Sequence, residues 1–102
     1  MNPDERVDKA VAAFEGADRE FIVALAKDVE RPELARLAGA VSQAAEEWET
    51  AAYALFFELR DKRKAEAGTI RRAEISAENA EVLHSTWSDL HEALSGRVPP
   101  PA

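Results

Sequence analysis

Hydrophobic residues recur along this chain at alternating steps of three and four, which is the spacing of one face of an α-helix. The longest such stripe predicts a helix from Pro32 to about Ala65, which would be roughly 50 Å long at 1.5 Å per residue. That length exceeds the width of a compact domain of this size, so either Gly39 bends the helix or the protein is an elongated hairpin. The stripe consists of Leu34, Leu37, Val41, Ala45, Trp48, Ala52, Leu55 and Leu59.

An earlier stripe predicts a helix from Pro3 to about Asp28, with Asn2 as its N-cap. Gly16 interrupts the run, so two shorter helices are the alternative. Pro32 separates this segment from the central helix, because the residue before a proline is disfavoured in the helical conformation. The apolar positions of the stripe are Val7, Val11, Phe14, Phe21, Leu25 and Val29.

A third helix is predicted after Gly68, which is the expected C-cap of the central helix. Thr69 or Ser76 would begin this helix, and Val82 and Leu83 mark the face expected to be buried. Residues 96–102 contain three consecutive prolines and are predicted to be a disordered tail. The stripe of this helix consists of Val82, Leu83, Trp87, Leu90 and Leu94.

The fold class follows from these helices and from the lack of any sustained two-residue alternation that would indicate strands. We expect an all-α protein with a single helical domain over residues 1–95, either a three-helix antiparallel bundle or an extended helical hairpin with a long central helix. Residues are 46% hydrophobic but only 7% aromatic, so bulky core side chains are scarce and oligomerisation would help.

Composition argues against several classes of function. The chain has no cysteine, which removes disulfides, thiolate metal sites and a cysteine nucleophile. No apolar run approaches the roughly 20 residues of a membrane span, and the first nine residues are unlike a signal peptide, so we expect no membrane contact and a cytoplasmic location. The net charge of −7 argues against nucleic-acid binding.

Charge is unevenly distributed along the chain. The segment from Arg60 to Arg72 contains six basic and two acidic residues, a local charge of +4. These cations either oppose the dipole at a helix C-terminus or form a docking patch for an acidic partner.

Few residues have a spacing that suggests a catalytic or metal-binding site. Glu81 and His84 are three apart, as in one ligand pair of a ferritin-like di-metal bundle, with Glu46, Glu47 and Glu49 as candidate partners. Only one such pair occurs, and a partly exposed pair that binds no metal is the alternative.

The segment Trp48-Glu49-Thr50-Ala51-Ala52-Tyr53-Ala54-Leu55, continued to Leu59-Arg60, resembles the helical part of nitrile hydratase beta subunits and their accessory (activator) proteins. Gly68, the segment Arg71 to Ile75 and the segment Trp87 to Leu94 follow in the order of that family. The similarity covers about the second half of the chain.

This resemblance implies a small helical subunit or accessory chain of a larger enzyme, not catalytic alone. Iron or cobalt would be held by cysteines of a partner subunit, and this chain would bind no cofactor itself. Arg71, or Arg72 if the register slips by one, would hydrogen-bond an oxidised cysteine of that partner. The partner, another protein or a second copy, would cover Trp48, Tyr53, Phe56, Phe57 and Trp87.

Two other functions remain open from the sequence. One is a free-standing interaction module such as an immunity protein, antitoxin or inhibitor, which an acidic surface and a small helical body would suit. The other is a ferritin-like metal-binding bundle that uses Glu81 and His84.

Overall fold

Three helices make up almost all of the computed structural model, which describes residues 2–62 and 65–96. They are α1 (Pro3–Ala26), α2 (Arg31–Lys62) and α3 (Ala67–Leu94). The described residues contain no strand, so the predicted all-α fold with three helices is confirmed. Residues 97–102 of the predicted tail lie outside the described residues.

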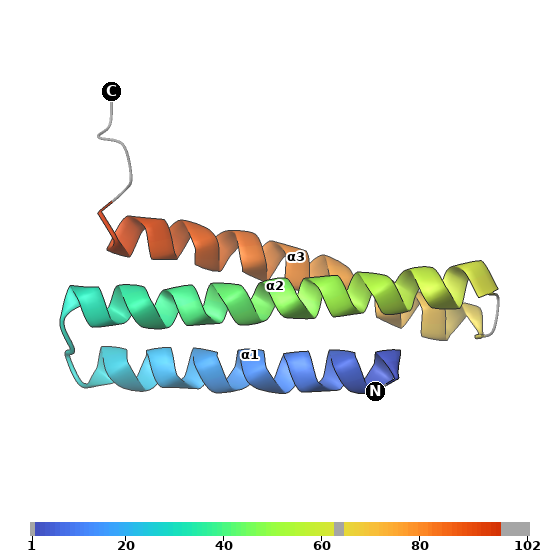
Figure 1. The fold of residues 1–102 in the computed structure, drawn as a ribbon, viewed down its shortest axis with the longest axis horizontal. Coiled ribbons are helices and arrows are strands. Elements are labelled where there is room, and N and C mark those ends of the chain that lie inside the picture. The colour runs from blue at the N-terminus through green and yellow to red at the C-terminus, as the bar shows by residue number, and fades with distance from the viewer. Residues whose placement is uncertain (1, 63–64, 97–102) are drawn as a thin grey trace, which may run out of the picture.

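The long central helix α2 is the element on which the other two pack. Figure 1 shows α1 along one side of α2 and α3 along the other, both antiparallel to it. Over the described residues the backbones of α1 and α3 stay apart, although Phe21 and Trp87 meet between them, and the structure is elongated, with extents of 48 × 33 × 19 Å. The radius of gyration is 16.0 Å, whereas a compact chain of this length has roughly 13 Å.

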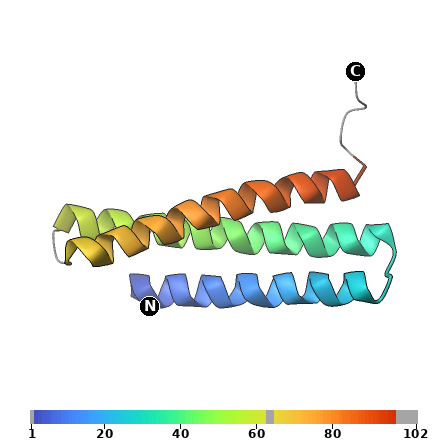
Figure 2. The ribbon, with the colours of Figure 1, turned by 180° about the vertical axis from the view of Figure 1, so that it is seen from behind.

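The α2–α3 hairpin extends beyond the N-terminus of α1, as the view from behind shows (Figure 2). Helix α2 contains 32 residues and continues through Gly39 without a break. Gly39 therefore does not break the helix, and α1 and α3 both pack antiparallel on this long central helix. None of the three helices, over the described residues, has a stretch long and apolar enough to cross a membrane.

Helix α1 is a single helix that continues past Gly16. Its N-cap is Asn2, whose side-chain oxygen accepts a hydrogen bond of 2.8 Å from the backbone N–H of Glu5. The helix ends at Ala26, and Asp28 then adopts a left-handed conformation with φ of 60°. The predicted cap and the prediction of one helix are both confirmed.

Helix α3 begins earlier than its sequence indicated. The carbonyl of Glu66 accepts hydrogen bonds from the backbone N–H groups of Thr69 (3.0 Å) and Ile70 (3.1 Å), so the first turn starts at Ala67. Gly68 lies inside that turn and is not the C-cap of α2. The predicted start at Thr69 or Ser76 is wrong for the same reason.

The core is built mainly from alanine. Val41 is the largest side chain that is fully buried, and the larger apolar side chains are mostly half-buried. Small side chains at a helix contact allow the helix axes to approach closely. The buried residues are Ala10, Phe21, Ala24, Ala35, Leu37, Ala38, Val41, Ala44, Ala45, Ala51, Ala52, Ala73, Ala77 and Ala80.

The expectation that Val82 is buried is wrong. Its side chain is 64% exposed, whereas Ala80 is completely buried. Positions two residues apart on an α-helix are related by a rotation of roughly 200° about its axis, at 3.6 residues per turn. Because Ala80 is buried against α2, Val82 points to solvent. Leu25 of α1 is likewise exposed, because α3 does not cover that flank of α1.

Candidate interaction surface

Both tryptophans predicted to meet a partner pack against other helices of their own chain. The ring of Trp48 lies 5.5 Å from that of Phe14, and its Nε1–H donates a hydrogen bond of 3.0 Å to Ser76 Oγ. Trp87 contacts the ring of Phe21 edge-on, with centroids 5.0 Å apart. These contacts join all three helices, and Trp48 and Trp87 therefore stabilise the fold whether or not a partner also touches them.

The other three predicted interface residues form one cluster on α2. The rings of Tyr53 and Phe57 stack with centroids 5.9 Å apart, and Phe56 lies 5.4 Å from Phe57. Tyr53 is five residues from Trp48, roughly 140° around the helix, so it points away from α1. Phe57 is 43% exposed, and the cluster is a partly open aromatic surface.

Arg60 extends over this cluster. Its guanidinium carbon lies 4.9 Å from the centroid of Phe57 and 5.4 Å from that of Phe56. The contact is a cation–π interaction, worth about 0.5–1 kcal/mol at an exposed site. The sequence placed Arg60 in the basic segment but did not predict its contact with the two phenylalanines, although its steps of three and four from them place all three on one side of the helix.

Carboxylates of α3 border the aromatic cluster. The hydroxyl of Tyr53 donates a hydrogen bond of 2.5 Å to Glu81 Oε2. This bond raises the pKa of Tyr53 to about 12, with smaller contributions from lost hydration and from the negative charges of Glu81, Glu78 and Glu49. The phenol therefore stays protonated well above its usual range and acts as a hydrogen-bond donor.

His84 makes its contacts with a different part of α2. Its Nδ1 lies 3.3 Å from Glu49 Oε2, and its Nε2 lies 3.9 Å from Glu46 Oε2. Glu81 is directed to Tyr53, so the predicted pair of Glu81 and His84 does not share a partner. Among residues 2–62 and 65–96, no group of three or more His, Asp or Glu side chains is placed to hold a metal ion.

Together these side chains form one surface on the α2–α3 hairpin, which we call the Tyr53 face. Tyr53 points to the side of the hairpin away from α1, whereas Glu46 also borders a hollow lined by Arg6 of α1. The residues of the Tyr53 face are Glu46, Glu49, Tyr53, Phe57 and Arg60 of α2, with Glu78, Glu81 and His84 of α3.

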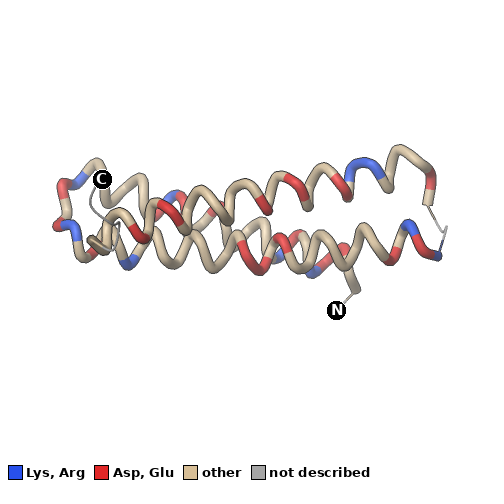
Figure 3. The backbone as a smooth tube through the Cα atoms, turned by 90° about the horizontal axis from the view of Figure 1, so that it is seen from above, with Lys and Arg blue, Asp and Glu red and all other residues tan. Residues whose placement is uncertain are grey.

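Of the basic residues predicted as a patch, Arg63 and Lys64 lie outside the described residues. The other four lie at the end of the hairpin, and acidic residues follow along both helices toward its middle (Figure 3). Lys62 pairs with Glu58 at 2.9 Å in the last turn of α2, where a cation opposes the helix dipole. Arg71 pairs with Glu74 and lies 3.8 Å from Glu78.

The two arginines singled out by the nitrile hydratase resemblance are both exposed at the surface of α3. Arg71 is held by the acidic residues one and two turns further along its helix, as above. Arg72 donates a hydrogen bond of 3.2 Å from Nη2 to Thr69 Oγ1. Their contact with an oxidised cysteine of a partner stays a prediction.

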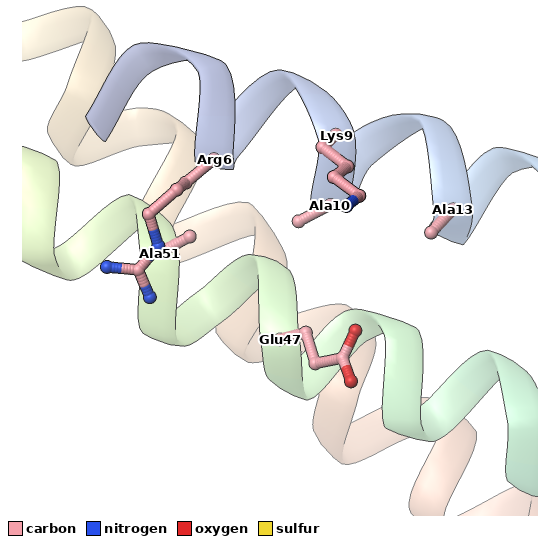
Figure 4. A pocket seen from close by; sticks show the side chains of 6 residues that line it. All are labelled: Arg6, Lys9, Ala10, Ala13, Glu47 and Ala51. Carbon is pink, nitrogen blue, oxygen red and sulfur yellow. The ribbon is translucent and has the colours of Figure 1, made fainter. Parts of the chain in front are cut away.

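A shallow groove lies between α1 and α2, apart from the Tyr53 face. Three alanines, Ala10, Ala13 and Ala51, leave a volume of about 320 Å³ there. Arg6 and Lys9 approach it from α1 and Glu47 from α2 (Figure 4). Of the residues that the sequence singled out for binding or catalysis, the candidate metal ligand Glu47 lines this groove.

Comparison with known proteins gives no relative. No family model, no curated protein and no solved structure matches this chain. The function must therefore be inferred from the surface itself.

Proposed function

We propose that this chain is a helical subunit that acts by binding another polypeptide chain through the Tyr53 face. The observation that carries the proposal is the exposure of Phe57, at 43%, within a stacked aromatic cluster. Aromatic side chains are enriched at the centres of protein interfaces, where their rigid rings bury large areas at a small entropic cost. Phe57 is thus the expected anchor of the interface.

The small size of the side chains buried within the chain supports the same proposal. The core contains mostly alanine, and the structure is elongated. Each Å² of apolar surface removed from water contributes about 25 cal/mol, so a chain with little bulky core gains much from a partner that covers its aromatic residues. A subunit of a larger enzyme and a free-standing interaction module are both forms of this function, and they differ in the partner.

A site-specific photocrosslinker tests the proposal in living cells. A benzophenone analogue of phenylalanine replaces Phe57, and the same analogue at Val82 is the control, because Val82 is an exposed apolar residue of the hairpin outside the Tyr53 face. We expect illumination to give a discrete crosslinked species from position 57 that position 82 does not give. No crosslink at position 57, or the same products from both positions, would contradict the proposal.

A further inference from the structure

We propose that the occupant of the Tyr53 face is a second copy of this chain, packed antiparallel across a two-fold axis near Tyr53. Arg60 of each copy then lies against Glu46 of the other. This inference rests on the proposed function, because it names the polypeptide that the Tyr53 face binds.

The spacing of three residues on α2 carries the argument. Glu46, Tyr53 and Arg60 are seven residues apart, which is close to two turns, so they lie on one stripe at intervals of roughly 10.5 Å. The stripe reads acid, aromatic, base. Both ends are exposed, since the side chain of Glu46 is 62% exposed and that of Arg60 is 54% exposed, and within the chain Arg60 Nε pairs with Asp61 at 3.1 Å.

A two-fold axis makes such a stripe complementary to itself. In an isologous interface, if one residue contacts a second across the axis, the second contacts the first in return. An axis at the level of Tyr53 therefore pairs Arg60 with Glu46 of the other copy, and also pairs Glu46 with Arg60. A parallel arrangement would instead bring like charges together.

On α2, the other residues of the Tyr53 face have the same polarity along the helix axis. Glu49 lies on the acidic side of Tyr53, and Phe57 lies on the basic side with Arg60 above its ring. Under the same axis Tyr53 meets its counterpart at the middle of the contact, and Phe57 falls level with Glu49 of the other copy, about 6 Å from that middle. The rings contribute apolar burial, and the two charge pairs fix the orientation.

The polarity of this surface also selects among partners. A uniformly basic segment of another protein would be attracted by Glu46 and Glu49 but repelled by Arg60 and by Arg71 at the end of the hairpin. A uniformly acidic segment would meet the opposite conflict. An antiparallel copy pairs each end of the α2 stripe with the opposite charge.

Charge reversal tests the inference in solution. We expect the wild-type chain to be a dimer by sedimentation equilibrium, and E46R or R60E alone to raise the dimer dissociation constant about tenfold or more, since each change puts two like-charge contacts in place of two ion pairs. Mixing the E46R and R60E chains should restore a dimer that contains one of each, because every charge pair is then opposite again.

Matched controls change the same charges on α1, where Glu15→Arg and Arg19→Glu lie outside the Tyr53 face and should leave the dissociation constant unchanged. Circular dichroism confirms that each variant is folded. A wild-type chain that stays monomeric, a dimer insensitive to E46R and R60E, or a mixture that forms no heterodimer would each overturn the inference. A crosslink from position 57 to a different protein would overturn it while supporting the proposed interaction function.

Discussion

The imidazole of His91 on α3 lies directly against Gly39 on α2. A Cβ atom at position 39 would stand 2.8 Å from Cε1 and 2.9 Å from Nδ1 of that ring. The ring is also held in place, because Nδ1 lies 2.8 Å from the carbonyl oxygen of Ala35, which can only accept a hydrogen bond. Gly39 therefore gives α3 its close approach to α2.

Replacing Gly39 by alanine should destabilise the protein despite the better helix propensity of alanine. The substitution gains about 1 kcal/mol in propensity, but overpacking costs about 1–3 kcal/mol and moving the ring would break its bond to Ala35. We expect a net loss of about 1 kcal/mol in the free energy of unfolding, measured by urea denaturation.

Gly16 provides the control, since a Cβ there would meet nothing within 4 Å. Gly16→Ala should raise stability by about 1 kcal/mol, the propensity gain alone. In a His91→Ala background the penalty at Gly39 should vanish, as a double-mutant cycle would show. Equal stabilisation by both glycine substitutions would rule out the steric role of His91.

Tyr53 should ionise at unusually high pH. It is the only tyrosine in the chain, so the ultraviolet absorbance of tyrosinate reports this residue alone. We expect a midpoint near the pKa of about 12, and a lower midpoint in Glu81→Gln, which weakens the main cause of the shift. Glu92→Gln is the control, because Glu92 does not contribute to this shift.

The raised pKa of Tyr53 also predicts how stability depends on pH. Between the ordinary value of 10.0 and about 12, the folded chain binds more protons than the unfolded chain, so stability falls as pH rises. The contribution is fully present below pH 10 and is lost as pH passes about 12. Tyr53→Phe should remove this part of the decline, measured as the change in unfolding free energy between the two pH values.

The alanine contacts of α2 should not tolerate larger side chains. Ala45 is completely buried and Ala54, on the same helix, is exposed. Ala45→Leu should destabilise the protein by about 1–3 kcal/mol through overpacking, whereas Ala54→Leu should change stability by no more than about 0.5 kcal/mol. Thermal unfolding of the two variants checks this, and similar melting temperatures would contradict close packing at Ala45.

The sequence predicted the helices well because their apolar residues recur every three or four positions. Trp48, Leu55 and Leu59 mark the central helix at that spacing, and Asn2 and Pro3 mark the start of the first. Both signals are local, so they need no knowledge of the partner helix.

The side of α3 that is buried, and the residues that meet in the Tyr53 face, were harder to predict. Buried positions of α3 are alanines such as Ala77 and Ala80, which carry little hydropathy, so the larger Val82 suggested the wrong face. The bond from Tyr53 to Glu81 joins residues 28 positions apart, and it depends on the register of α2 against α3, which sequence periodicity does not specify.

Arg31 should hold the end of α3 in place. Its Nε donates a hydrogen bond of 3.0 Å to the carbonyl of Leu94, and its Nη2 donates one of 2.6 Å to that of Ala93. These are the last carbonyls of α3, and that of Ala93 also accepts a hydrogen bond of 3.3 Å from the backbone N–H of Gly96. Lysine in Arg31→Lys cannot form this bidentate pair of hydrogen bonds. We therefore expect the free energy of unfolding to fall by about 1 kcal/mol and hydrogen exchange in the last turn of α3 to become faster.

Arg36→Lys is the matched control, because the guanidinium of Arg36 pairs with Glu33 on its own exposed helix surface. Exposed pairs of this kind contribute about 0–1 kcal/mol, and exchange at the end of α3 should not change. Hydrogen exchange followed by mass spectrometry separates the two arginines: protection lost from the last turn of α3 in both variants, or in neither, would show that Arg31 does not secure that helix end.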